Sequence, residues 1–170
     1  MIDPTQDAIA MPPLDVTDVI DRAASLAPGD PLHTARRFRP QVIEATQASH
    51  EALLLQPVAG LSTADRLRVA AHVCGVAGAA SLAQHYEARL ADTAGPGTPP
   101  SSAVPAMLHF AAALTTDPRL GDRTALDTLR RAGLGDPAIV ALAQLVAFLA
   151  YQLRVVAGLQ AMRANRAGTP

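Results

Sequence analysis

One segment, residues 61–90, constrains the fold most, because it has the features of a single long helix. It runs LSTADRLRVAAHVCGVAGAASLAQHYEARL. Ser62 is a suitable N-cap, and Asp65 three residues later approximates a capping box. Gly75 and Gly78 soften the middle of the segment without breaking the pattern. We therefore predict one helix over about residues 63–91.

Further helix signals occur along the chain, separated by Pro and Gly. We expect these helices at about residues 16–26, 40–55, 105–114, 123–132 and 136–163. Asp15 is the expected cap of the first, and Asp136 followed by Pro137 marks the start of the last. Residues 95–102 are too rich in Pro and Gly to be helical and are expected to form a mobile surface loop. No useful β-alternation is present, so we predict an all-α bundle of about six helices.

Length and composition indicate a single folded unit. A chain of 170 residues with 49% hydrophobic residues is long enough to bury a sizeable core. We expect residues 14–165 to form one domain and residues 1–13 to be a flexible N-terminal segment. Aromatic residues make up only 3% and Trp is absent, so Ala, Leu and Val must fill the core. Small side chains of this kind favour closely packed helices.

Charge and hydropathy exclude several classes of protein. The net charge of -1 gives no basic field that would attract nucleic acid. Lys is absent, which excludes a Schiff-base or P-loop lysine. The longest apolar run, residues 138–151, contains Gln144 and is too short and too polar for a membrane span. The N-terminus lacks the pattern of a signal peptide. We therefore expect a cytoplasmic protein without nucleic-acid or membrane partners.

Four residues of the long predicted helix fall on one stripe. Cys74, Gly78, Ser81 and His85 are spaced 4, 3 and 4 residues apart. A hydroxyl–imidazole bond between Ser81 and His85 is feasible, whereas Cys74 lies about 16 Å from His85 along the axis. We take His85, Ser81 and Cys74 as candidate catalytic residues. The alternatives are a core or interface histidine for His85 and a buried small hydrophobe for Cys74.

The last predicted helix carries a polar group, Tyr151, Gln152 and Arg154, inside an apolar stretch. An arginine in such a place needs either an internal carboxylate or a bound anion. The candidate carboxylates are Glu44, Glu51 and Asp65. We take Arg154 and Tyr151 as candidate substrate-binding residues. With one cysteine and no histidines at metal-ligand spacing, we expect no metal and no cofactor.

Three segments together resemble the carboxymuconolactone decarboxylase and alkylhydroperoxidase D-like (AhpD-like) superfamily, and look closest to its peroxidase-related, CMD-domain branch. They are RPQVIEATQASHEALL at residues 39–54, LSTADRLRVAAHVCGVAGAASLAQHY at residues 61–86 and LRRAGLGDPAIVALAQLVAFLAYQLRVVAGL at residues 129–159. The resemblance implies an AhpD-like helical fold. It also implies a homo-oligomer built through helices like that at residues 63–91.

The family's two-thiol chemistry is not retained here. Its active members carry a CxxCxxxH pattern, in which one thiolate attacks a peroxide and the second resolves the sulfenic acid to a disulfide. Anchored on His85, the two thiol positions fall on Gly78 and Ser81. The family's glutamate falls around residues 66–67, with Asp65 the nearest acid. Serine and glycine cannot form a sulfenic acid, so we expect peroxidase activity to be residual or lost.

Three functional hypotheses follow, and they leave open whether the chain is an enzyme. The first is a relative of the antioxidant alkylhydroperoxidases with residual or lost activity. The second is a thiol-independent lyase or isomerase that acts on a small carboxylic acid, with His85 as general acid or base and Arg154 as anchor. The third is a non-catalytic protein that binds a ligand or an active, CxxC-bearing paralogue.

Overall fold

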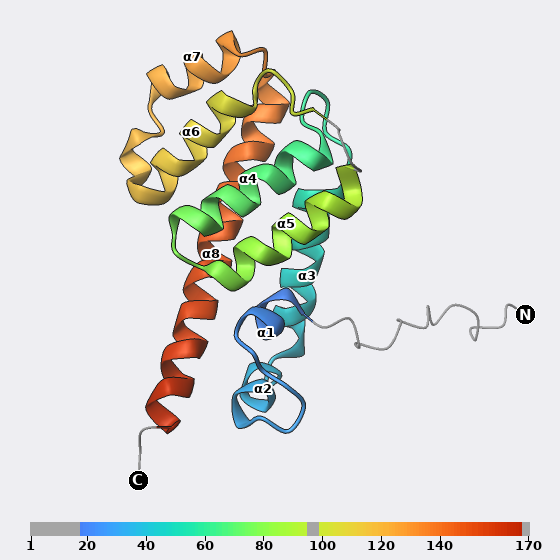
Figure 1. Cartoon of the computed structure of the whole chain (residues 1–170), viewed down its shortest axis with the longest axis vertical. Helices are drawn as coiled ribbons and strands as arrows, with labels where there is room; N and C mark the ends of the chain where they lie inside the picture. The colour runs from blue at the N-terminus through green and yellow to red at the C-terminus, as the bar shows by residue number, and fades with distance from the viewer. Residues whose placement is uncertain (1–17, 95–98, 168–170) are drawn as a thin grey trace, which may run out of the picture.

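The structure, a computed structural model, describes residues 18–94 and 99–167. Within these ranges it contains eight α-helices, one short 3-10 helix and no strand (Figure 1). The predicted all-α class is confirmed, with eight α-helices in place of about six. In chain order they are α1 (Val19–Ala23), α2 (Pro31–Arg36), α3 (Pro40–Leu55), α4 (Thr63–Val76), α5 (Ala80–Ala94), α6 (Val104–Thr116), η1 (Pro118–Leu120), α7 (Arg123–Arg131) and α8 (Asp136–Ala167).

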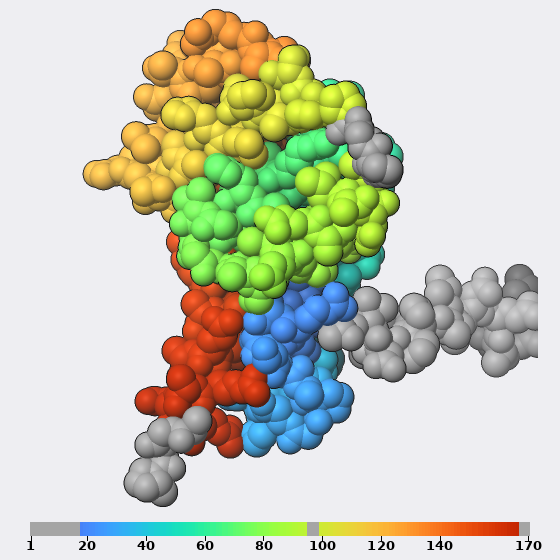
Figure 2. Space-filling view, in the orientation of Figure 1, coloured from blue at the N-terminus to red at the C-terminus, as the bar shows by residue number. Residues whose placement is uncertain are grey.

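The long helix α8 runs the length of the molecule, and the other helices pack around it (Figure 1). It contacts α1, α3, α4, α6 and α7. Its residues Leu142, Leu145 and Leu149 are fully buried. At one end of the molecule its C-terminal part lies beside α1 and α2 (Figure 2). There Arg163 donates hydrogen bonds to the carbonyls of Ala24 and Ser25, so the end of α8 is fastened to the end of α1.

The predicted single helix over residues 63–91 is wrong. Gly78 has a φ of 72°, and α4 ends before it while α5 begins after it. The N–H of Gly78 donates to the carbonyl of Gly75 at 3.0 Å, and that of Ala79 donates to the carbonyl of Cys74 at 2.9 Å. This is a Schellman C-cap, which requires a left-handed residue and therefore favours glycine. Cys74 and His85 consequently lie on different helices, and the predicted stripe does not exist.

The N-terminal region differs from the prediction in two ways. The helix expected at residues 16–26 is α1, whose cap is Asp18, with Oδ1 accepting from the N–H of Ile20 at 2.7 Å. Asp15, the segment 1–13 and residues 95–98 of the predicted loop lie outside the described residues. Helix α2 was not predicted at all. Asp30 caps it and Pro31 opens it, the same signal that marks the start of α8.

An ion-pair network holds α1 against α2. Asp18 and Asp21 are buried on α1 and its cap. Arg36 donates to both carboxylates, with Nη2 at 2.8 Å from Asp18 Oδ2. Arg37 Nη2 lies 2.7 Å from Asp21 Oδ2. Because buried carboxylates are costly unless they are paired, this network fixes how the two short helices dock.

Helix α8 is longer than expected and continues to Ala167 as one helix of 32 residues. Among the helices of the described residues, it is the one whose length and apolarity are sufficient to cross a membrane, with a mean hydropathy of 1.9 over its most apolar 18-residue window. The core helix of a soluble domain meets the same criterion. The packing of α8 against five other helices explains the buried part of its apolar surface, which is 39% of its most apolar 18-residue window.

Candidate functional site

A buried polar group of side chains surrounds Tyr86 of α5. The Tyr86 hydroxyl donates to Oε1 of Gln152 on α8 at 2.6 Å. The His50 ring from α3 stacks on the Tyr86 ring, with centroids 6.2 Å apart and planes 23° apart. The His85 ring meets Tyr86 edge-on, with centroids 5.1 Å apart. We call these four residues, Tyr86, Gln152, His50 and His85, the Tyr86 cluster; three helices supply it.

His50 is a member of this cluster that the sequence analysis missed. It is only 2% exposed, and neither ring nitrogen has a hydrogen-bond partner among the described residues. Burial, followed by the charges of Arg89 and His85, lowers the pKa of His50 to about 4, so the ring is neutral at pH 7. The sequence did hold a signal: Ile43, His50 and Leu54 follow helical spacing, and all three are buried.

His85 is half-buried, and its Nε2 is buried without a partner in the described part of the chain. Burial, followed by the charges of Arg22 and Arg89, lowers the pKa of His85 to about 4. Neither arginine forms an ion pair with a carboxylate among the described residues. A neutral imidazole with an unpaired nitrogen therefore lies within the electrostatic influence of two arginines, of which Arg22 is exposed and Arg89 is half-buried. Such a setting suits a bound anion next to a proton acceptor.

The other two candidate catalytic residues have structural explanations, although Cys74 lies close enough to Tyr86 to contribute, after burial, to the raised pKa of that hydroxyl. The Ser81 hydroxyl donates to the carbonyl of Ala23 at 3.1 Å, so it ties α5 to the end of α1 instead of bonding His85. Cys74 is fully buried in α4, and burial raises the pKa of its thiol to about 12. At neutral pH the thiol is protonated and shielded from solvent. This agrees with the alternative interpretation of Cys74 as a buried small hydrophobe.

The polar group on α8 divides between two faces. Gln152 points inward to Tyr86, whereas Arg154 is exposed and donates to the carbonyl of Ala150 one turn earlier at 3.2 Å. The expected carboxylate partner of Arg154 is not found within residues 18–94 and 99–167; Asp65, for example, pairs with Arg68 at 2.9 Å. Arg154 is thus exposed to solvent although it lies within an apolar stretch of the sequence.

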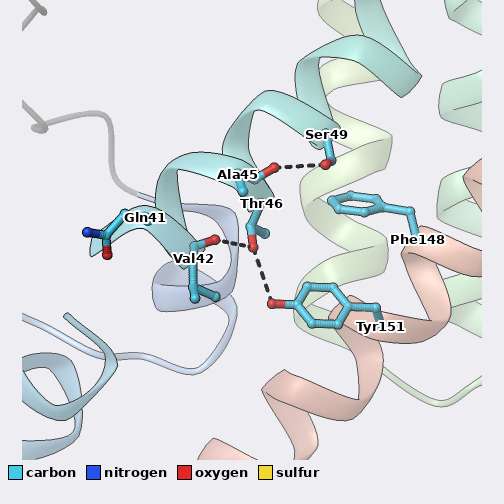
Figure 3. Close-up of a pocket in the computed structure, with 7 residues that line it drawn as sticks. All are labelled: Gln41, Val42, Ala45, Thr46, Ser49, Phe148 and Tyr151. Carbon is cyan, nitrogen blue, oxygen red and sulfur yellow. Dashed lines mark hydrogen bonds between the residues drawn. The ribbon is translucent and has the colours of Figure 1, made fainter. Parts of the chain in front are cut away.

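Tyr151 lines an open cleft between α3 and α8, which we call the α3–α8 cleft (Figure 3). Its volume is about 380 Å³. The lining residues are Gln41, Val42, Ala45, Thr46, Ser49, Phe148 and Tyr151. The Phe148 ring forms one wall, and its centroid lies 6.2 Å from those of both Tyr151 and His50. Phe148 thus connects the cleft to the Tyr86 cluster.

Within the described ranges, no group of three His, Cys, Asp or Glu side chains is placed to hold a metal ion. What the Tyr86 cluster offers from its own residues is hydrogen bonding and proton transfer by two neutral imidazoles. The nearby arginines add positive charge at His85.

The fold is similar to that in the crystal structure of an uncharacterized peroxidase-related protein from Silicibacter sp. TM1040. The TM-score is 0.57, and the sequence identity is 20% over 73% of this chain and 71% of that chain. At this identity the likeness shows the fold alone. The sequence matches no protein-family model and no curated protein. This chain therefore has a fold found in a peroxidase-related protein, and its membership of the AhpD-like superfamily stays a prediction.

Proposed function

We propose that this chain is an AhpD-like protein in which proton transfer at His85 replaces thiol chemistry, so that it acts as a lyase or isomerase on a small carboxylate. One observation carries the proposal: Nε2 of His85 is buried without a partner in the described chain, under the charges of Arg22 and Arg89. In this proposal the two arginines take the anchoring role first given to Arg154.

The proposed chemistry begins with the neutral imidazole of His85 removing a proton from a carbon next to a carbonyl. The electron pair of the broken C–H bond moves onto the carbonyl oxygen as an enolate, and the proton stays on the ring. In a substrate with a C=C bond attached to that carbon, the enolate extends over the double bond, and returning the proton to its far carbon moves the double bond and completes an isomerisation. In a substrate without it, the proton returns to the same carbon and the reaction is seen as exchange with solvent. A carboxylate bound beside Arg22 and Arg89 offsets their charge, which raises the pKa of His85 from about 4 and strengthens it as a base.

Thiol peroxidase chemistry has little support from the same residues. The single cysteine, Cys74, is buried with a thiol pKa of about 12, and positions 78 and 81 carry no sulfur. A resolving thiol is therefore absent from the chain. We expect peroxide consumption with a dithiol reductant to remain at background, in the native protein and in Cys74→Ala alike.

The test follows exchange of carbon-bound protons of levulinate, a small keto carboxylate, in D₂O by proton NMR. We expect the native protein to accelerate exchange and His85→Gln to reduce the rate by about 100-fold or more. Arg89→Gln should raise the KM for levulinate by about tenfold, because an anchoring charge is lost. His109→Gln, an exposed histidine on α6, is the matched control and should leave the rate unchanged.

Two outcomes would overturn the proposal. Exchange that survives in His85→Gln would show that His85 is not the base, and exchange that is lost in Cys74→Ala would show that the thiol takes part in the reaction.

The pH dependence of kcat/KM provides a further check, because this quantity reports the ionisation of the free enzyme. In the native protein it should be nearly flat between about pH 6 and 8, because the pKa of His85 in the free protein is about 4.

A further inference from the structure

His50 has no role in the proposed function, yet it is the most unusual buried group of the described chain. Among the described residues, it is the buried side chain for which every polar atom lacks a hydrogen-bond partner. An unpaired buried polar group costs about 1–3 kcal/mol. Native structures rarely keep such a group without a reason, and a ligand that supplies the missing bonds is one such reason.

The α3–α8 cleft is connected to His50 through one residue of its lining, Phe148. The Phe148 ring lines the cleft and also meets the His50 ring edge-on, with centroids 6.2 Å apart and planes 60° apart. Figure 3 shows this ring directed from α8 toward α3, beside Ser49. Phe148 is half-buried and its ring lies between the cleft and His50, so a ligand in the cleft reaches His50 only if this ring turns aside.

The side chains that line the cleft indicate which chemical class of ligand it can bind. No charged side chain is among the described residues that line it, which favours a neutral molecule. Phe148 and Tyr151 supply aromatic rings, and a volume of about 380 Å³ suits a small molecule.

The hydroxyl groups of the wall are already engaged. Thr46 donates to the carbonyl of Val42 at 2.7 Å and lies 3.2 Å from the Tyr151 hydroxyl, and Ser49 donates to the carbonyl of Ala45 at 2.7 Å (Figure 3). Gln41, the other polar residue of the lining, is exposed to water, whereas the two ring nitrogens of His50 behind Phe148 are buried without a partner in the described chain. Neutral imidazole has one donor and one acceptor nitrogen, so a ligand hydroxyl can pair with it.

We propose that the α3–α8 cleft binds a small neutral phenol, whose ring packs against Phe148 and Tyr151 and whose hydroxyl hydrogen-bonds to His50. Phe148 screens His50 in the free protein and moves aside when the ligand enters. This site is separate from the levulinate site proposed at His85 and does not depend on any catalysis there.

The first test is an NMR titration of the native protein with phenol, following the ring signals of His50 and Tyr151. Toluene, which has the same ring without the hydroxyl, and benzoate, which adds a charge, are the matched probes. We expect phenol to shift both residues and to bind about tenfold more tightly than toluene, the value of one hydrogen bond. His50→Leu should lower the phenol affinity to that of toluene. Equal binding of phenol and toluene, or no shift at His50, overturns the proposal.

The second test measures whether Phe148 screens His50. Diethyl pyrocarbonate modifies neutral imidazole, and mass spectrometry locates the modified histidines. We expect His50 to react slowly in the native protein and about tenfold faster in Phe148→Ala, with Phe148→Leu in between. Val140→Ala, an exposed apolar residue of the same helix, should leave the rate unchanged. If Phe148→Ala does not fold, Phe148→Leu decides the outcome; a native rate at His50 in a folded variant overturns the screening role.

Discussion

Two regions of this molecule bury polar side chains, and they differ in whether those side chains have partners. Between α1 and α2, the carboxylates of Asp18 and Asp21 are held by arginines, and the charges compensate one another. In the Tyr86 cluster, His50 and His85 are neutral rings with nitrogens that lack partners in the described chain. The first region is explained by the fold. The fold alone does not explain the second region, because its ring nitrogens are left unpaired. The Tyr86 cluster is therefore the part of the molecule where a functional site is expected.

Arg66 shows that an unusual buried group can still have a structural explanation. It is 1% exposed and has no carboxylate partner among the described residues. Its Nη1 donates to the carbonyl of Leu53 at 2.9 Å and its Nη2 to Oγ1 of Thr63 at 3.2 Å. Leu53 lies in the last turn of α3, where carbonyls need donors and a positive charge is favourable. Arg66 is thus a helix cap, an explanation that His50 lacks.

The largest expected change in stability comes from disrupting the ion-pair network between α1 and α2. Asp21→Ala removes the buried carboxylate that Arg36 and Arg37 share, which leaves Arg36 paired with Asp18 alone and Arg37 without its carboxylate. We expect the free energy of unfolding to fall by about 3–5 kcal/mol, measured by urea denaturation. Asp127→Ala, which removes a carboxylate from the exposed Asp127–Arg130 pair within α7, is the matched control and should leave the midpoint nearly unchanged. Equal effects of the two variants would contradict the importance of the buried network.

A pH titration tests the unpaired region. The pKa of His50 is lowered from its ordinary value of 6.5 to about 4, so between these values the unfolded chain binds the proton more readily. Stability should therefore fall as the pH drops from about 6.5 to 4, by about 3 kcal/mol from His50. His50→Leu should lose this part of the pH dependence, whereas Ser49→Ala should keep it. The same slope in His50→Leu and the native protein would contradict the assignment.

The Tyr86–Gln152 hydrogen bond tests the satisfied half of the cluster. Gln152→Leu leaves the buried Tyr86 hydroxyl without its acceptor, and we expect a loss of about 2 kcal/mol in unfolding free energy. Tyr86→Phe combined with Gln152→Leu removes both partners and should recover most of that loss. A double variant as unstable as Gln152→Leu would show that the bond is not the source of the effect.

The smallest expected effect has the opposite sign. His50→Leu replaces an unpaired imidazole by an apolar side chain, and the gain should be about 1 kcal/mol in unfolding free energy. The affinity for phenol should fall in the same variant. Together the two results would show that His50 lowers the stability of the native protein and raises its affinity for phenol. A loss of stability would instead show that His50 has a partner that the fold requires.

The sequence predicted helices that begin and end at local signals. Residues 40–55 form α3 as predicted, and α6 and α7 lie close to their predicted ranges, because Pro, Gly and Asp act through their immediate neighbours. Gly78 was misjudged because a glycine costs about 1 kcal/mol inside a helix and also suits a C-cap. The local sequence does not distinguish the two, whereas the packing of α4 on α5 does.

The orientation of the α8 polar residues was beyond the sequence for a similar reason. Apolar residues occur nearly all around this helix, so its pattern does not reveal which face meets α5. Packing selects Gln152 for the interior and leaves Arg154 outside. The single domain over residues 14–165, the homo-oligomer, the CxxC-bearing paralogue and the cytoplasmic location stay predictions.

The turn at Gly78 also bears on whether sulfur chemistry can be engineered into this chain. A Cβ added there would meet nothing within 4 Å, so space is not the obstacle. The obstacle is the left-handed backbone, which costs a side chain about 1–2 kcal/mol. Exchanging Gly78 and Ser81 for cysteines would therefore place the first thiol on a strained hinge between α4 and α5. Building a two-cysteine site here would require remodelling the backbone before any gain in reactivity.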